Sequence, residues 1–140
     1  MSNFSYLSTH PEYSLFANSA IEAEKVFSTS PAMCAVGCQK ALELAVKWVY
    51  AADKTITMPY KDNLQSLLHE PSFRFAVDRD VWSVLPSIVK AGNLAVHTGH
   101  SVSAADAVFS LRGLFDFIQW VDYCYGTDYV ERSFDETAIP

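Results

Sequence analysis

The chain has 140 residues, of which 50% are hydrophobic and 14% aromatic, and its formal net charge is −6 at pH 7. A chain of this size can bury roughly two thirds of its unfolded surface in one domain, and its composition excludes a disordered protein. The negative charge argues against indiscriminate binding to nucleic acid or to an anionic membrane, although a local basic patch remains open. The N terminus lacks the basic start and apolar run of a signal peptide, and no stretch approaches ~18 uncharged apolar residues. We therefore expect a cytoplasmic protein without membrane contact.

The first part of the chain is predicted to form two antiparallel helices. Residues 1–10 are expected to be an irregular arm, and a first helix is expected from Pro11 to about residues 27–29. A second helix begins after Ser30, whose side-chain oxygen can accept a backbone N–H, and runs to Ala52 with apolar residues at i, i+4 and i+7. At about 1.5 Å per residue it spans the width of a small domain, so we expect it to be the central helix.

Shorter helices are predicted after a polar loop over residues 53–59. Asp62 or Asn63 can cap a helix that stops before Pro71, because the residue preceding a proline disfavours helical geometry. Residues 72–78 are expected to form another short helical turn that presents aromatic side chains.

A longer helical pattern extends over residues 80–97. Pro86 lies inside it and lacks a backbone N–H, so it must kink or break the helix. Gly92 stands among small residues that would let another backbone approach closely. Residues 98–101 are expected to form a turn.

The last predicted helix begins after Ser103, which forms a capping box with Asp106, and ends at Gly126. It carries two apolar stripes, Ala107, Leu111, Leu114, Ile118 and Val121 on one and Phe109, Phe117, Trp120 and Cys124 on the other. The narrow polar strip left for water contains Arg112, Asp116, Gln119 and Tyr123. Such a helix is either central in the bundle or shared with a partner. We favour burial in the bundle, with a homodimer through residues 103–125 as the alternative.

The end of the chain, residues 127–140, has alternating charges and no apolar period. We interpret it as a linker or docking tail toward a downstream region, and residues 1–126 as one helical bundle domain. No internal repeat or low-complexity segment divides the chain further.

The three cysteines are an odd number, and they are interpreted as thiols rather than as a metal site. Cys34 and Cys38 lie one helical turn apart, but no second Cys or His pair completes a tetrahedral set of ligands. We favour reduced core thiols for both of them and for Cys124, and we expect no metal.

Asn93 and His97 stand four residues apart on one face of the predicted helix. One hypothesis is a contact with nucleic acid or a nucleotide, or a His97 that acts as an acid or base near its ordinary pKa of ~6.5. The other is a buried polar pair that satisfies backbone groups where Pro86 and Gly92 disturb the helix. We favour the second hypothesis, in which loss of either polar side chain destabilises the fold.

Other basic and aromatic residues are candidates for surface contacts. The lysines that could line one side of the bundle are Lys40, Lys47, Lys54 and Lys61. Glu43 lies among them and no glycine-rich loop accompanies them, so a solvated face is favoured over a phosphate site. The tyrosines that could stack on bases if exposed are Tyr50, Tyr60, Tyr123, Tyr125 and Tyr129. Packing at the core boundary is the commoner use of tyrosine.

Several catalytic signatures are missing from the sequence. It has no GxSxG, HExxH, Walker A or dinucleotide-binding motif, and no PD motif followed by a D/ExK nuclease signature. This absence favours a non-catalytic domain.

The order and spacing of several short motifs resemble a HEPN-like helical domain found at the N terminus of the R subunits of type I restriction enzymes. These motifs are Ser30-Pro31, Lys40-Ala41-Leu42-Glu43, Asn63-Leu64-x-x-Leu67 and Ile88-x-Lys90-x-Gly92-Asn93-x-x-x-His97. The run Glu131-Arg132-x-Phe134-Asp135 looks like the segment that leads from this domain into the rest of such a subunit.

The resemblance implies a parent protein that is a site-specific deoxyribonuclease, with ATP and Mg²⁺ used by downstream translocase and nuclease domains. It also implies DNA and the other subunits of a restriction complex as partners. Asn93 and His97 match the polar and His positions of the family motif, and Lys90, Lys40 and Lys47 are further contact candidates. HEPN ribonucleases carry an Arg ahead of the His, whereas here Gly92 precedes Asn93. That departure favours a non-catalytic module over a ribonuclease.

The sequence therefore predicts an all-α, HEPN-like bundle of about five main helices. Its expected function is assembly or nucleic-acid contact within a restriction R subunit. The alternatives are a metal-independent ribonuclease that uses His97 and a free-standing dimeric adaptor.

Overall fold

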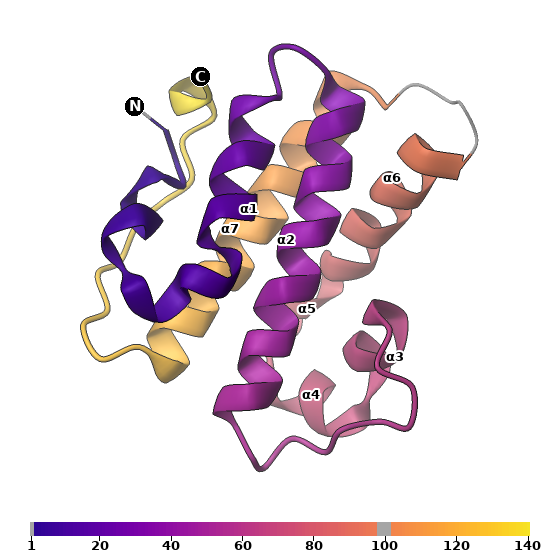
Figure 1. The fold of residues 1–140 in the computed structure, drawn as a ribbon, viewed down its shortest axis with the longest axis vertical. Coiled ribbons are helices and arrows are strands. Elements are labelled where there is room, and N and C mark those ends of the chain that lie inside the picture. The colour runs from indigo at the N-terminus through magenta and orange to yellow at the C-terminus, as the bar shows by residue number, and fades with distance from the viewer. Residues whose placement is uncertain (1, 98–101) are drawn as a thin grey trace.

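The protein is an all-α bundle, shown as a ribbon in Figure 1. A computed structural model describes residues 2–97 and 102–140, and these contain no strand. Their α-helices are α1 (Ser14–Lys25), α2 (Pro31–Ala52), α3 (Leu64–His69), α4 (Pro71–Ala76), α5 (Arg79–Ser83), α6 (Leu85–His97) and α7 (Ala104–Tyr125). Three 3-10 helices accompany them, η1 (Ser5–Thr9), η2 (Pro11–Tyr13) and η3 (Glu136–Ala138). The predicted all-α class is confirmed. The predicted turn over residues 98–101 lies outside the described residues.

Helix α2 is the centre of the bundle, as predicted, and it packs against α1, α6 and α7 (Figure 1). The Ser30 hydroxyl accepts a hydrogen bond from the backbone N–H of Met33 at 3.1 Å, and Pro31 occupies the first helical position. The fully buried side chains of this helix include Cys34, Cys38, Leu42, Val46 and Val49. None of the helices in the described residues is long and apolar enough to cross a bilayer.

The N-terminal segment is more ordered than the sequence predicts. Residues 5–9 form a 3-10 helix, and Phe4 and Leu7 are buried in the core. The carboxylate of Glu24 on α1 is fully buried. It accepts a hydrogen bond from the backbone N–H of Phe4 at 3.1 Å and another from the side-chain amide of Asn3 at 2.8 Å. Because apolar burial and a buried carboxylate both hold this segment, the expectation of an irregular arm is wrong.

Helix α1 is shorter than predicted at both ends. Its α-helical part begins at Ser14, because Pro11 to Tyr13 form a 3-10 turn, and it ends at Lys25. The residues up to Thr29 form a hydrogen-bonded turn that leads directly into α2.

The first short helix has its predicted cap, and the second is capped by a residue that the sequence pattern did not indicate. The Asn63 side chain accepts a hydrogen bond from the backbone N–H of Ser66 at 2.9 Å, and α3 ends before Pro71. Helix α4 starts at Pro71, one residue earlier than predicted, because the Glu70 carboxylate caps it by accepting a hydrogen bond from Ser72 N–H at 2.7 Å. Phe73 on this helix is buried, whereas Phe75 is 89% exposed.

The predicted helix over residues 80–97 is broken. Helix α5 ends at Ser83 and α6 begins at Leu85, so Pro86 stands in the first turn of a new helix. Backbone N–H groups in a first turn have no partner within the helix, so the missing N–H of proline costs no hydrogen bond there. The Asp78 carboxylate caps α5 by accepting hydrogen bonds from two backbone N–H groups.

Helix α7 is largely buried, as favoured from its two apolar stripes. The Ser103 hydroxyl accepts a hydrogen bond from Asp106 N–H at 3.1 Å, which confirms the predicted cap. Two stripe residues are exceptions, since Phe109 is 47% exposed and Cys124 is also exposed. At the other end, Gly126 has a φ of −75°, so a left-handed turn does not explain the glycine. A side chain there would lie 2.8 Å from the Tyr13 hydroxyl, and close packing is therefore the reason.

Two interhelix contacts depend on a glycine. A Cβ added at Gly37 on α2 would lie 2.8 Å from the Cβ of Ala23 on α1. A Cβ added at Gly92 on α6 would lie 2.7 Å from the Cβ of Gln39 on α2. The close approach expected at Gly92 is thus present, and a second one brings α1 against α2.

Residues 127–140 return along the N-terminal segment, and the two chain ends lie side by side (Figure 1). Asp135 N–H donates to the Asn3 side chain at 2.7 Å, and the Asn3 amide donates to the Asp135 carbonyl at 2.9 Å. The Phe134 ring packs edge-on against Phe115 of α7. These contacts place the tail against the bundle.

We predict that Gly37→Ala destabilises the protein. The added methyl meets Ala23 at a helix–helix contact, and overpacking of this kind destabilises by about 1–3 kcal/mol. This outweighs the stabilisation of ~1 kcal/mol that alanine brings to a helix in place of glycine. The measurement is the urea midpoint followed by circular dichroism. Ser87→Ala, at an exposed position of α6, is the control and should stay within about 0.5 kcal/mol of the wild type. An unchanged midpoint for Gly37→Ala would show that the close contact does not constrain the helices.

Candidate functional site

Three of the predicted site residues lie together on one face of α6. Lys90, Asn93 and His97 are exposed and line an open groove with Gln65 of α3. The apolar side of this groove is formed by Pro86, Val89 and Leu94. The helical spacing of four residues therefore produces a shared surface.

Asn93 is tied to α2 rather than to His97. The side-chain amide of Gln39 donates hydrogen bonds to the Asn93 side-chain oxygen at 2.8 Å and to the Val89 carbonyl at 3.1 Å. No hydrogen bond joins Asn93 to His97 within the part of the chain that the structure describes. Both side chains are exposed, so the expectation of a buried polar pair is wrong. The break at Pro86 lies seven residues before Asn93, about two helical turns away.

The two lysines predicted on α2 do not join this groove. Lys40 lines a separate groove between α1 and α2, next to Gly37. Lys47 lies further along α2 and forms an ion pair with Glu43 at 2.9 Å, and this hydrogen bond raises the pKa of Lys47. The basic candidates are therefore dispersed over the surface.

The α6 groove is suited to binding rather than to a complete acid–base mechanism. Among the described side chains that line it, the ionisable groups are Lys90 and His97. An exposed imidazole beside a lysine and an amide can donate hydrogen bonds to acidic or carbonyl groups of another molecule. A general acid–base pair would need a second group placed at hydrogen-bond distance from the reacting atoms.

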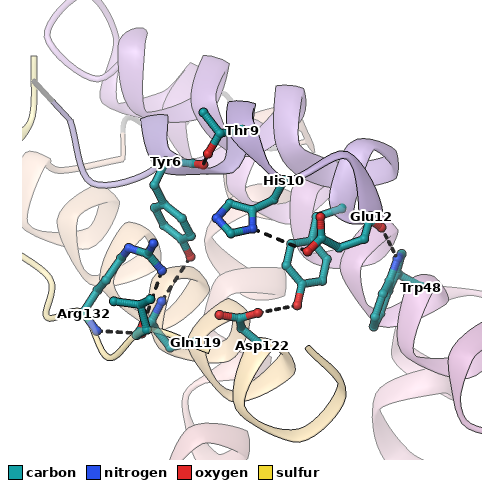
Figure 2. A network of polar contacts seen from close by, with 10 residues as sticks. Tyr6, Thr9, His10, Glu12, Trp48, Gln119, Asp122 and Arg132 are labelled. Carbon is teal, nitrogen blue, oxygen red and sulfur yellow. Dashed lines mark hydrogen bonds and ion pairs between the residues drawn. The ribbon is translucent and has the colours of Figure 1, made fainter. Parts of the chain in front are cut away.

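A second polar cluster, shown in Figure 2, joins the N-terminal segment, α7 and the tail. The Gln119 side-chain amide donates to the Tyr6 hydroxyl at 3.1 Å, and the Gln119 side-chain oxygen accepts from the backbone N–H of Arg132 at 3.0 Å. The Arg132 guanidinium lies over the Tyr6 ring, 3.9 Å from its centroid. Gln119 is buried under the tail, so its predicted place on the solvent strip of the last helix is wrong.

The same cluster contains a buried carboxylate. The Tyr13 hydroxyl donates to one oxygen of Asp122 at 2.5 Å, and Asp122 is 2% exposed. The other oxygen of Asp122 has no hydrogen-bond partner among the described residues. Burial and the Asp122 hydrogen bond raise the pKa of Tyr13 far above its ordinary value, and burial raises the pKa of Tyr6 to about 12.

Sequence analysis missed this cluster, although a signal for part of it exists. Asp122 follows Ile118 by four residues on a buried face of α7, so it is an acidic residue within an apolar stripe. Glu24 shows the same pattern on α1, four residues after the buried Ala20. The partners of both carboxylates come from distant parts of the chain, which no local pattern indicates.

The cysteines are all free thiols. Cys34 and Cys38 are buried, as predicted, and Cys124 is exposed rather than in the core. The hydrogen bond that the Cys38 thiol makes with Cys34, together with its burial, raises the pKa of Cys38. Within residues 2–97 and 102–140, no three His, Cys, Asp or Glu side chains are grouped as metal ligands.

We predict that Asn93→Ala and His97→Ala each leave the urea midpoint within about 0.5 kcal/mol of the wild type, as changes of exposed residues do. Ile88→Ala on the same helix is the sensitivity control. Ile88 is fully buried, so its truncation should cost about 2–5 kcal/mol. A large loss of stability for His97→Ala would restore the hypothesis of a structural polar pair.

We also predict that the protein loses stability as the pH rises above ~10. Burial raises the pKa of both Tyr6 and Tyr50 to about 12, while tyrosines of the unfolded chain ionise near ~10. Between pH ~10 and ~12 the folded state therefore keeps tyrosine protons that the unfolded state releases. In this range the free energy of unfolding falls by at most ~1.4 kcal/mol per pH unit for each such tyrosine.

Urea midpoints measured on both sides of that pH check this prediction. Tyr50→Phe should reduce the slope, and Tyr60→Phe, at a fully exposed side chain, should leave it unchanged. A midpoint that does not move with alkaline pH would contradict the assignment of these buried hydroxyls.

Comparison with known proteins identifies a family for most of the chain. The family model described as a domain of unknown function, DUF4145, matches residues 21–125. The match contains α2 to α7 in full, and with them the α6 groove, but not the N-terminal segment or the tail. No curated protein and no solved structure matches the chain. Because the matched region covers well over half of its length, the chain belongs to the DUF4145 family.

Proposed function

We propose that this chain is a non-catalytic assembly module, equivalent to the N-terminal domain of the R subunit of a type I restriction-modification system. In this proposal it is a cytoplasmic protein region, and ATP-dependent DNA translocation and cleavage belong to downstream domains. The order of motifs along α2, α3 and α6 resembles such a domain, and this resemblance supports the parent system. The observation that carries the role of this domain is the open α6 groove, where Lys90, Asn93 and His97 are exposed beside apolar side chains.

The charge distribution favours contact with protein over contact with nucleic acid. The net charge is −6. Four of the described lysine and arginine side chains lie within 4.0 Å of an acidic oxygen, namely Lys25, Lys47, Arg79 and Arg112. Lys90 and Lys40 line different grooves. A nucleic-acid site usually needs several basic side chains on one face, because phosphate contacts supply most of its affinity.

ATP and Mg²⁺ are assigned to the downstream domains in this proposal. No grouping of three acidic, His or Cys side chains in the described residues is arranged to hold a metal ion, and the sequence has no Walker A motif.

Two other functions each have one supporting observation. A HEPN-type ribonuclease that needs no metal is supported by the exposed His97 beside Lys90. A dimeric adaptor that uses residues 103–125 is supported by Phe109, which is 47% exposed on α7.

The first test separates the assembly module from a ribonuclease. Wild type and His97→Ala are incubated with a structured RNA and a single-stranded RNA, and the products are resolved by gel electrophoresis. We expect no cleavage that depends on His97. Cleavage by the wild type that His97→Ala abolishes would overturn the proposal, since this variant is expected to keep the fold.

The second test addresses assembly. The protein is coexpressed with the other subunits of the restriction system of its own genome, and the complex is analysed by size-exclusion chromatography with light scattering. We expect the wild-type chain to coelute with the other subunits. The double variant Lys90→Glu, Asn93→Ala should coelute with them less. Absence of a complex would contradict the assembly role, and a homodimer of the isolated chain would favour the adaptor.

A further inference from the structure

A second groove lies away from the α6 surface, between the segment from α4 to α5 and the C-terminal half of α7. Phe75 and Val81 line it on one side, and Trp120, Tyr123 and Tyr129 line it on the other. It lies on the same side of α7 as the exposed Asp116. This groove shares no lining residue with the α6 groove, so the two surfaces can act independently.

Three of the four aromatic side chains that line this groove are exposed, and Trp120 is half-buried. Phe75 is 89% exposed, Tyr123 is 69% exposed and Tyr129 is 37% exposed. Tyr123 and Tyr129 meet edge to face with ring centroids 5.3 Å apart, so the tail holds one tyrosine against the other. Large apolar side chains that gather on a surface mark an interaction site more often than single ones do.

The charged side chains that line the groove are all acidic. They are Asp78, Asp80 and Asp116, and none of the described lining residues is Lys or Arg. Asp80 has a basic neighbour in Arg79 at 3.7 Å, but both side chains are at least 90% exposed, so this pair neutralises little. The groove therefore combines an apolar aromatic surface with a net negative charge.

Asp116 contributes the acidic group on the α7 side of the groove. Neighbouring side chains shield it from water, which raises the pKa of its carboxyl, and Arg112 opposes this only in part. The Arg112 guanidinium is directed instead to the Phe134 ring, 4.9 Å from its centroid, and to Glu136 at 3.9 Å. A cation placed in the groove would be within reach of the exposed Asp116 carboxylate.

We infer that this aromatic, acidic groove is a docking site for a basic, apolar segment of a partner protein. Leucine-like side chains of that segment would pack on Phe75 and Val81, and its Lys or Arg side chains would pair with Asp80 and Asp116. A guanidinium could also stack on the exposed tyrosine rings, as Arg132 does on Tyr6 elsewhere in this chain.

Charge excludes the other main class of occupant. A nucleic acid would stack its bases on the tyrosines, but its phosphates would meet the three aspartates without a basic side chain to offset them. A basic protein segment satisfies both the aromatic and the acidic part of the surface. This inference rests on the proposed assembly function and names the chemistry of one partner.

The probe is a fluorescein-labelled synthetic amphipathic peptide with Leu on one face and Lys and Arg on the other. Its binding to the full chain is measured by fluorescence anisotropy, with a matched peptide in which each Lys and Arg is replaced by Glu. We expect saturable binding of the basic peptide, weakening with added salt, and none of the acidic one.

Matched variants locate the site. Phe75→Ala and Asp116→Asn should each weaken binding about fivefold or more, as loss of a central apolar or charged contact does. The controls are Leu15→Ala, at a position 53% exposed, and Asp62→Asn, at an exposed acidic residue outside the groove. Both controls should bind like the wild type. Because Phe75 is exposed, its truncation should leave the urea midpoint unchanged, which excludes unfolding as the cause of lost binding.

Equal binding by Phe75→Ala, Asp116→Asn and the wild type would overturn the inference, as would a single-stranded DNA probe that binds the groove and competes with the peptide. Failure of the groove and failure of the proposed function are distinguishable. Peptide binding without coelution of the other restriction subunits would reject the restriction complex and keep the groove. Coelution that Phe75→Ala and Asp116→Asn leave intact, without peptide binding, would reject the groove alone.

Discussion

The close approach of α1 and α6 to α2 is the constraint on which the rest of the structure depends. At Gly37 a side chain would lie 2.8 Å from Ala23, and at Gly92 a side chain would lie 2.7 Å from Gln39. Protein interiors are packed at crystal-like density, so neither helix can move outward without leaving a void. The second contact also determines the α6 groove, because Gln39 hydrogen-bonds Asn93 and so joins one groove residue directly to the central helix.

The chain ends form the other side of the molecule, and there polar groups replace glycine contacts. Glu24 is fully buried, and its oxygens accept N–H groups of Asn3 and Phe4, while Asn3 also pairs with Asp135 of the tail. A buried carboxylate is tolerated only when hydrogen bonds satisfy it. Since one side chain, Asn3, contacts both Glu24 and the tail, the N-terminal segment and residues 127–140 are held as one layer on α1 and α7 (Figure 1).

Local signals explain which parts of the fold could be predicted. The caps at Ser30, Asn63 and Ser103 each accept a backbone N–H three residues away, and the break at Pro86 follows from its own missing N–H. Each of these is encoded within one helical turn. The burial of Glu24 depends on a segment 20 residues away in the chain, so the α-helical periodicity around it contains no information about its partner.

The same distinction separates the polar residues of the candidate site. Helical spacing placed Asn93 and His97 on one face correctly, but burial depends on which part of the helix faces its neighbour. The backbone of α6 packs on α2 at Gly92, and the exposed Asn93 reaches α2 through its hydrogen bond to Gln39. Asp122 differs from Asn93 and His97 because it lies within an apolar stripe and is buried. Its partner, Tyr13, is 109 residues away in the sequence. Buried polar groups such as Asp122 hold this fold, and the exposed Lys90 and His97 beside the α6 groove are the ones left available to other molecules.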